Sequence, residues 1–186
     1  MIFNTHPELE GKHAFLSPSQ YHWIRYDKKK LKSVYLKHLA VERGTKLHEL
    51  AQKCIEMEVQ LMPLGKTLDM YVNHCIEFKM KPEVGLKYSD KCFGRADAIS
   101  YRRKKLRIFD LKTGSIPAHM EQLMIYAALF CLEYKIKPKD ISIELRIYQS
   151  DDILMLEPKR EEIESIMESI ISGDIVLQET DNEMEK

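Results

Sequence analysis

Apolar side chains recur with a helical period over the first part of the chain, up to about Met80. Leu47, Leu50, Ala51, Cys54 and Ile55 follow this period most clearly. The pattern predicts four helices: a short aromatic one over Gln20–Tyr26 begun by Ser17 or Ser19, one capped by Asp27, one from Lys46 to about Gln60 opened by Gly44, and one capped by Thr67.

The middle of the chain changes to the alternating pattern that is typical of strands. Three extended segments joined by short turns predict an antiparallel meander: Glu83–Tyr88, Cys92–Tyr101 and Leu106–Lys112. The pattern then predicts a helix from near Pro117 to Tyr134, a strand over Ile141–Gln149, a helix over Lys159–Ser172 and a frayed acidic tail from Gln178.

This order of elements predicts an α/β fold, with a small mixed β-sheet flanked by helices and a helical N-terminal segment. A length of 186 residues, 44% of them hydrophobic, fits a single domain with one core. Within residues 1–186 we expect a helical part (1–81), a part with the sheet and a further helix (82–150), and a C-terminal helix with an acidic tail (151–186).

The formal net charge is zero, but the charges are unevenly distributed along the chain. Residues 1–112 hold 22 Lys and Arg against 13 Asp and Glu, and residues 113–186 hold 7 against 16. Such an asymmetry fits a protein that binds a polyanion, and it equally fits a surface on which charges mix after folding. No apolar run approaches the roughly 20 residues of a membrane span, and the N-terminus does not resemble a secretory signal.

Candidate chemistry lies on two neighbouring predicted strands. Asp97 falls in a stretch of small residues, and Asp110 ends an apolar run two residues before Lys112. Alternation places Asp110 and Lys112 on the same face. Each residue alone fits an ordinary surface position, but carboxylates in apolar surroundings are costly unless they are paired or bind a metal. Two carboxylates beside a lysine suit Mg²⁺ or Mn²⁺ and phosphodiester hydrolysis.

Two helical positions add to this set. Gln122 and Tyr126 are four residues apart and share a helix face, and His48 lies in the third predicted helix. A lone helical histidine is more often structural than a ligand, and a lone tyrosine more often belongs to the core.

In order along the chain, these motifs resemble the RecB-like branch of the PD-(D/E)XK nuclease superfamily. They comprise a helical histidine after a Gly-Thr pair (Gly44 to His48), Gly94 to Asp97 on a strand, Asp110 to Lys112 on the next strand, and Gln122 to Tyr126 on a helix. The segment from Leu16 to Gln20 is similar to the N-terminal signature of CRISPR-associated RecB-like exonucleases and their phage relatives.

The resemblance implies a restriction-endonuclease-like core and a metal-dependent exonuclease that acts on single-stranded DNA or DNA ends. It implies that His48, Asp97, Asp110 and the carbonyl of Leu111 bind the metal, with Lys112 as the catalytic lysine. Gln122 and Tyr126 would place the substrate strand or support the site. Glu83 is a weaker candidate, without a firm counterpart in the family. Recombination or repair in the cytoplasm of a bacterial or phage-infected cell is the implied setting.

The cysteines depart from the family pattern. Many relatives bind an iron–sulfur cluster through one cysteine near the N-terminal signature and three after the Gln-x-x-x-Tyr helix, but Tyr26 occupies the first position here and no cysteine follows Cys131. We therefore expect no iron–sulfur cluster. Mn²⁺ or Mg²⁺ is the expected cofactor, and an imidazole ligand favours Mn²⁺.

Several features leave the mode of DNA binding open. The hairpin Arg102–Lys105 and the helix start Lys28–Lys32 could follow a phosphate backbone, and the aromatic run Tyr21–Tyr26 could stack on bases, although packing is the preferred interpretation of Trp23. A nuclease-fold subunit that binds DNA or protein without cleaving is the alternative function. A homo-oligomer or a recombination-type complex also stays open.

Overall fold

The structure is a computed structural model, and it describes residues 4–184. The chain divides into two compact units between Arg43 and Gly44, within the long helix α1 (Lys28–Glu56). The single-domain prediction is not tested by this division, and the two units are described separately.

The first unit contains two short 3-10 helices and the beginning of α1. These helices are η1 (Pro7–Leu9) and η2 (Pro18–Arg25). Ser17 caps η2 by accepting a hydrogen bond from the amide of Ser19, and Asp27 accepts one from the amide of Lys30 at 2.7 Å, as the sequence predicted for both caps. The indole N–H of Trp23 donates to the carbonyl of Ser17, which supports a packing role for this ring.

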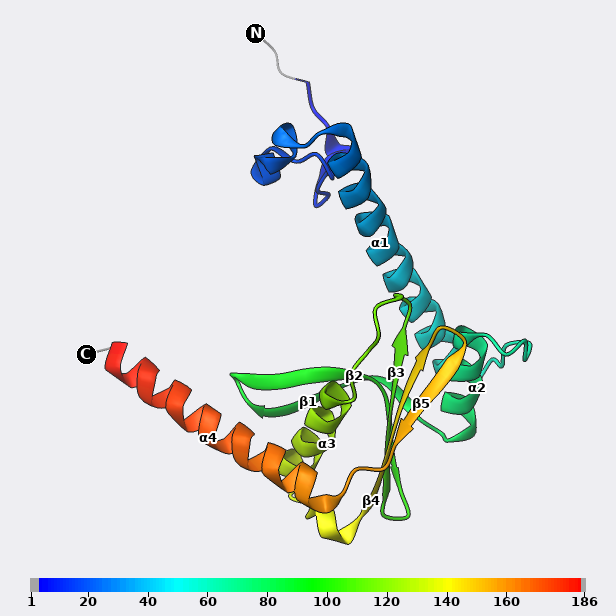
Figure 1. The fold of residues 1–186 in the computed structure, drawn as a ribbon, viewed down its shortest axis with the longest axis vertical. Coiled ribbons are helices and arrows are strands. Elements are labelled where there is room, and N and C mark those ends of the chain that lie inside the picture. Colours follow the sequence, from blue (N-terminus) through cyan, green and yellow to red (C-terminus); the bar gives the residue numbers. More distant parts are fainter. Residues whose placement is uncertain (1–3, 185–186) are drawn as a thin grey trace. The chain divides into compact units, whose positions relative to one another are not determined.

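The second unit is built on a five-stranded mixed sheet (Figure 1). The strands lie in the order β1 (Lys81–Ser89), β2 (Cys92–Arg102), β3 (Lys105–Lys112), β4 (Ser142–Gln149) and β5 (Asp152–Leu156). Only β3 and β4 pair in parallel, and α3 (Glu121–Glu133) connects them. The antiparallel meander, the mixed sheet and the α/β class are thus confirmed. The architecture is consistent with a restriction-endonuclease-like core.

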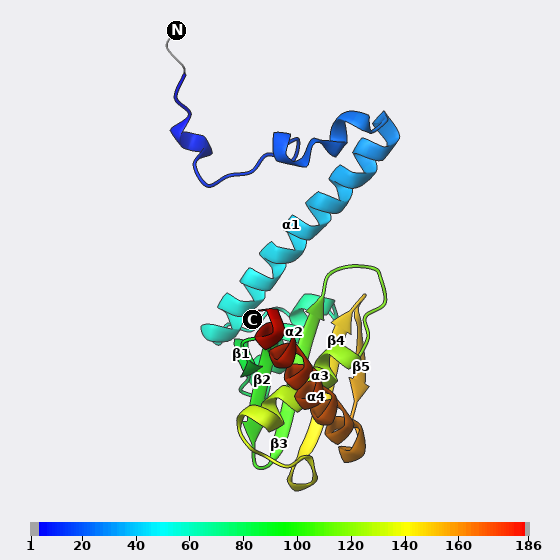
Figure 2. The ribbon, with the colours of Figure 1, turned by 90° about the vertical axis from the view of Figure 1, so that its left-hand side faces the viewer.

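Helices cover both faces of this sheet (Figure 2). On one face, α3 and α4 (Arg160–Met184) enclose an apolar core around Leu106, Ile108 and Leu145. On the other face, α2 (Thr67–Glu77) and the part of α1 after Gly44 enclose a second core around Phe109, Leu111 and Tyr148. The sheet is therefore buried from both sides, which explains why β3 and β4 are almost continuously buried.

The predicted helix boundary at Gly44 is wrong, because α1 runs through this residue without a break. A Cβ atom at position 44 would lie 2.8 Å from Oγ1 of Thr113. A glycine is needed at position 44 because the helix lies close to Thr113, the residue that follows Lys112. Thr67 is also not a cap but the first residue of α2, whose start is held by the carboxylates of Asp69 and Asp151.

Two further differences lie near the C-terminus. The sequence analysis missed β5, a short edge strand paired with β4. The predicted fraying from Gln178 is wrong over the described part of the tail, because α4 continues to Met184. Gln178 donates to Asp174, and Lys91 forms an ion pair with Asp181, so polar contacts hold the helix beyond the core. Residues 185 and 186 of the predicted tail lie outside the described residues.

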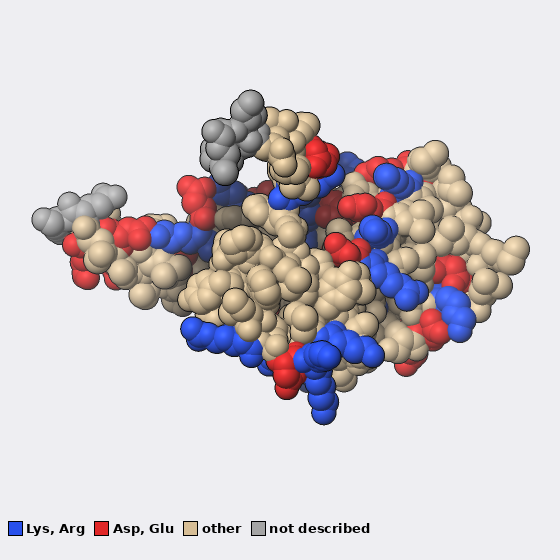
Figure 3. Space-filling view, turned by 90° about the horizontal axis from the view of Figure 1, so that it is seen from above, with Lys and Arg blue, Asp and Glu red and all other residues tan. Residues whose placement is uncertain are grey.

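Charged side chains of both signs share the surface. On the face in Figure 3, basic and acidic groups lie next to each other rather than on separate halves. Within residues 4–184, no helix combines the length and the apolar character that a membrane crossing requires.

A close contact between β2 and α3 yields a first prediction. A Cβ atom on Gly94 would lie 2.8 Å from a ring carbon of Tyr126, whereas one on Gly85, in the adjacent strand, would meet open space. We expect Gly94→Ala to destabilise the fold by about 1–3 kcal/mol, the usual cost of overpacking. Gly85→Ala should cost nothing or stabilise slightly.

Urea unfolding of the two variants and the wild type measures this difference. Gly85 pairs with Arg95 next to Gly94, so the two variants share a local environment and differ mainly in the space available. Equal stability of both variants would show that the ring of Tyr126 moves away at no cost.

Candidate active site

The conformation of β2 changes at Asp97. Pairing between β2 and β3 ends at Ala98 and Phe109. Ala96 packs in the core beneath α3, whereas Ala98 packs in the core beneath α2, so regular alternation is broken between them. Here the side chain of Asp97 reaches over to β3, where its Oδ2 accepts a hydrogen bond from the amide of Leu111 at 3.0 Å. The carboxylate thereby replaces the backbone partner that this amide lacks beyond the end of the pairing.

Glu83 lies opposite Asp97, in an irregular part of β1. The strands pair through Pro82 with Ala98 and through Val84 with Ala96, but Glu83 itself is unpaired and has a φ of 53°. A left-handed conformation is strained for a non-glycine residue and is often found at functional sites. This kink redirects the Glu83 side chain, which lies 3.9 Å from Arg95.

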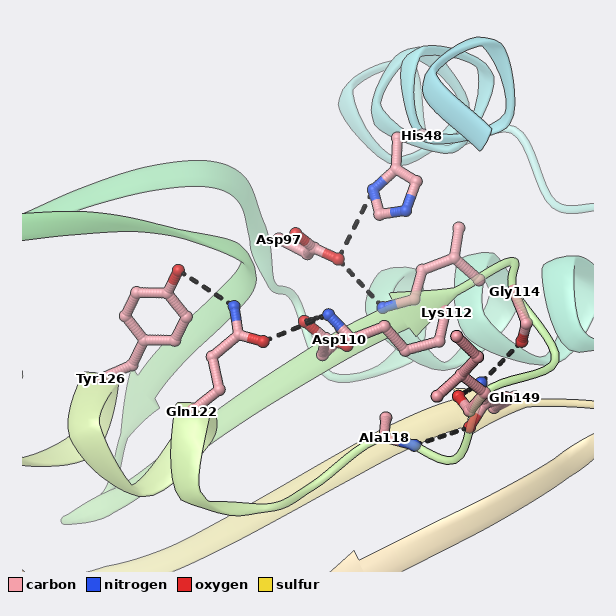
Figure 4. Close-up of polar contacts among 11 residues, drawn as sticks. His48, Asp97, Asp110, Lys112, Gly114, Ala118, Gln122, Tyr126 and Gln149 are labelled. Carbon is pink, nitrogen blue, oxygen red and sulfur yellow. Dashed lines mark hydrogen bonds and ion pairs between the residues drawn. The ribbon is translucent and has the colours of Figure 1, made fainter. Parts of the chain in front are cut away.

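His48, Glu83 and Asp97 form one cluster. Each offers a ligand atom, and the three atoms lie within 4.8 Å of one another. Nδ1 of His48 lies 3.5 Å from Oδ2 of Asp97. Figure 4 shows His48 projecting from α1 toward Asp97.

A second group of polar residues surrounds Lys112. Asp110 and Lys112 share a face, and Nζ of Lys112 lies 3.0 Å from Oδ2 of Asp110. The same ammonium donates to Oε1 of Gln122 at 3.2 Å, and Nε2 of Gln122 donates to the hydroxyl of Tyr126 at 3.4 Å (Figure 4). Gln122 and Tyr126, on α3, thus hold the lysine at the end of β3.

Burial makes these carboxylates electrostatically costly. Asp110 is 3% exposed, and its Oδ2 atom has an ion pair with Lys112 but no hydrogen bond. Burial, together with the nearby charge of Asp110, raises the pKa of Asp97 to about 6, despite the opposing amide of Leu111. A cation placed between the partly buried Asp97 and the buried Asp110 would offset the repulsion between these two carboxylates.

The donor set fits a divalent metal ion. Two carboxylates and one imidazole would serve Mg²⁺ or Mn²⁺. Both ions prefer oxygen ligands, and Mn²⁺ also accepts a nitrogen ligand. His48, Glu83 and Asp97 are the residues that would hold it, whereas the metal-binding role of Asp110, which pairs with Lys112, stays a prediction. The predicted role of the Leu111 carbonyl stays a prediction, since the recorded contact of this residue is through its amide.

The sequence-based set is therefore divided by the structure into a cluster with His48 and Asp97 and a network with Asp110, Lys112, Gln122 and Tyr126. Glu83 joins the first cluster, although sequence reasoning gave it little weight. In the sequence, Glu83 is only an acidic residue beside Pro82. The kink that turns its side chain toward Asp97 depends on the pairing of β1 with β2, which the sequence does not show.

Gln149, which the sequence analysis did not single out, fixes the loop after Lys112. Its Nε2 donates to the carbonyls of Gly114 and Ile116 at 2.6 and 2.7 Å, and its Oε1 accepts from the amide of Ala118 at 3.1 Å (Figure 4). One side chain at the end of β4 thus satisfies three backbone groups of the loop between β3 and α3. These hydrogen bonds hold the loop that connects Lys112, at the end of β3, with Gln122, at the start of α3.

The basic hairpin and the cysteines, also singled out in the sequence, contribute to the fold. Arg103 and Lys104 form the turn between β2 and β3 with positive φ, while Lys105 pairs with Glu144 at 2.6 Å. The cysteines are divided between the two cores: Cys54 and Cys75 lie on one face of the sheet, and Cys92 and Cys131 on the other. Burial raises the pKa of the Cys131 thiol to about 11, as expected for a packing residue.

Comparison with known proteins gives no assignment: no protein-family model, curated protein or solved structure matches this chain. The functional conclusion therefore depends on the chemistry of the site and on the order of its motifs.

The raised pKa of Asp97 yields a prediction for the metal-free protein. The folded pKa of about 6 exceeds the unfolded value of 3.8, so the folded chain binds more protons between these pH values and its stability falls as pH rises through them. Asp97→Asn keeps an acceptor for the Leu111 amide without the charge. It should stabilise the metal-free protein by about 1–3 kcal/mol at pH 7.5 and not at pH 4.

Urea unfolding in chelator at the two pH values measures this effect. Asp90→Asn is the matched control, because Asp90 is exposed and a hydrogen bond from Lys87 lowers its pKa. This control should gain no stability at pH 7.5. If Asp97→Asn gains none either, the carboxylate is not destabilised by its surroundings.

Metal binding provides a separate prediction. We expect Asp97→Ala and Asp110→Ala to abolish measurable Mn²⁺ binding, and Glu83→Gln to weaken it, because each removes one oxygen donor of the set. Isothermal titration calorimetry is the measurement. Glu49→Gln, an exposed carboxylate next to His48 in sequence, should bind Mn²⁺ like the wild type. Unchanged affinity in both aspartate variants would contradict the metal site.

Proposed function

We propose that this protein is a metal-dependent deoxyribonuclease of the PD-(D/E)XK superfamily, from its RecB-like branch. It hydrolyses phosphodiester bonds of single-stranded DNA or DNA ends as an exonuclease, in the cytoplasm of a bacterial or phage-infected cell. The observation that carries the proposal is Lys112, whose ammonium lies between the buried carboxylate of Asp110 and the side-chain oxygen of Gln122.

This arrangement suits attack on a phosphodiester. A metal ion bound by the carboxylates would polarise the phosphate and lower the pKa of a bound water molecule. The Lys112 ammonium carries a charge that can offset the negative charge developing on the phosphate, and it can orient the attacking water. Gln122 and Tyr126 restrict the lysine to one position, so little reorganisation is needed during the reaction.

The proposed metal ligands come from two strands and a helix. Asp97 and Asp110 approach from neighbouring strands, and His48 from α1, so the ligands are held by rigid elements rather than by loops. The imidazole of His48 would favour Mn²⁺ over Mg²⁺. The alternative is a binding subunit without cleavage activity, and it requires none of these residues to act on a phosphate.

The decisive experiment is cleavage of end-labelled single-stranded DNA in Mn²⁺, with and without chelator. Lys112→Ala should reduce the single-turnover rate about a hundredfold or more, the typical effect of losing one electrostatic stabiliser, while Mn²⁺ binding persists. Lys159→Ala is the matched control, because Lys159 is exposed directly before α4 and does not belong to the candidate active site. It should cleave at the wild-type rate.

The outcomes separate the two functions. Loss of cleavage in Lys112→Ala with intact metal binding supports catalysis by this site. A wild-type protein that binds DNA and Mn²⁺ but leaves the strand uncut supports the binding subunit instead. Equal rates for Lys112→Ala and the wild type would make the lysine an ordinary ion-pair partner.

A further inference from the structure

A cleft of about 290 Å³ lies along the last residues of β2, after Asp97. Apolar residues of β1 and β2 line it together with two sets of functional side chains. The first set is aromatic and consists of Tyr101, Phe130 and Tyr134; the second is cationic and consists of Lys79, Lys81 and Arg102. Asp97 and Arg102 are five residues apart on the strand, so Arg102 lies roughly 16 Å along the strand from Asp97, while Ile99 lines the cleft nearer to it.

The aromatic set continues a series that begins at the candidate active site. Gln122, Tyr126, Phe130 and Tyr134 are spaced four residues apart along α3 and its C-terminal cap, so each lies next to the one before it. The series spans about 18 Å of helix. It starts at the residue that contacts Lys112 and ends in the cleft. The aromatic side chains of α3 and its cap thus lead from the candidate active site to the cleft.

The rings in the cleft form an open platform. Phe130 is 6% exposed, and it contacts Tyr101 and Tyr134 with centroid distances of 5.2 and 4.8 Å. Tyr101 and Tyr134 are 40% and 52% exposed. A buried ring flanked by two half-exposed ones can accept a further planar group by stacking.

The charge of the cleft is uncompensated. The side chains of Lys81 and Arg102 have no ion-pair or hydrogen-bond partner within the described chain, and Lys79 has only an exposed contact with Glu58 at 3.7 Å. No carboxylate lines the cleft. By contrast, a second cleft near the C-terminal half of α4 mixes Lys87 and Lys91 with acidic partners. The first cleft therefore fits an anion that also carries a planar ring.

We propose that this cleft binds one nucleotide unit of a single-stranded nucleic acid. The base stacks on Tyr101 and Tyr134, and the adjoining phosphate contacts Lys81 and Arg102. Stacking on aromatic side chains beside a basic groove is how proteins hold single strands without reading their sequence. The proposed path of the strand from the cleft along α3 to Lys112 rests on the proposed nuclease function. Binding in the cleft itself needs neither metal nor cleavage.

The test measures binding of a fluorescein-labelled oligothymidylate to the full chain by anisotropy, in chelator so that cleavage does not interfere. Tyr134→Ala should weaken binding about fivefold or more, since loss of one stacking ring costs roughly 1–3 kcal/mol. Tyr134→Phe is the matched control. It keeps the ring and should bind within twofold of the wild type.

A salt series tests the phosphate contacts. Lys81→Ala with Arg102→Ala should reduce the slope of log affinity against log salt by about 0.7 for each contact removed. Lys159→Ala removes one cation outside the cleft and should leave both the affinity and the slope unchanged. Circular dichroism of each variant checks that the fold is retained.

The inference is overturned if Tyr134→Ala binds as tightly as the wild type, or if Tyr134→Phe loses as much affinity as Tyr134→Ala. Its failure is distinguishable from failure of the nuclease proposal. If the wild type cleaves DNA but the cleft variants bind as tightly as the wild type, the nuclease proposal stands and the proposed nucleotide site is wrong. If the cleft variants bind more weakly but the wild type never cleaves DNA, the nucleotide site stands and the nuclease proposal is wrong.

Discussion

The hydrogen bond from the Leu111 amide to the Asp97 carboxylate is the contact on which the rest of the site depends. It forms where β2 separates from β3, so a side chain takes over a connection that backbone pairing can no longer make. The bond fixes Asp97 near the end of β3, within reach of His48 and close to Asp110. It also draws a carboxylate into a buried position, and this burial is the main cause of its raised pKa.

A second constraint brings the helix to the sheet. Gly44 and His48 are four residues apart and share a face of α1. Because Gly44 has no side chain, the helix can approach Thr113, and the imidazole one turn later reaches Asp97. Gly94 has the same effect on the other side of the site, where its missing Cβ leaves room for the Tyr126 ring. Gly44 thus lets α1 approach the end of β3, and Gly94 lets α3 approach β2, and these four elements supply most of the polar groups of the site.

The sequence predicted those features that depend on local periodicity. Alternation correctly located the three strands of the meander and placed Asp110 and Lys112 on one face, and the helical period placed Gln122 beside Tyr126. It failed where long-range contacts decide. Gly44 looked like a helix boundary because its neighbour Thr113 is distant in sequence, and Glu83 carried little weight because its kink arises only on pairing with β2. The short strand β5 depends on its pairing with β4.

The sheet carries two buried charge clusters, and their opposite balance distinguishes structure from function. Glu144 pairs with three cations, Lys105, Arg107 and Arg146. Lys105 also contacts the exposed Glu157, and the two guanidinium groups stack on the ring of Phe78. Although burial opposes it, the Lys105 hydrogen bond and the nearby arginines hold the pKa of Glu144 below its usual range. That cluster supplies its own counter-charge. At the candidate active site the carboxylates exceed the cations, and burial keeps the pKa of Asp97 high. The proposed metal ion would supply the positive charge that Lys112 and Arg95 leave lacking at these carboxylates, and this difference in charge balance separates the candidate active site from the ion-pair network around Glu144.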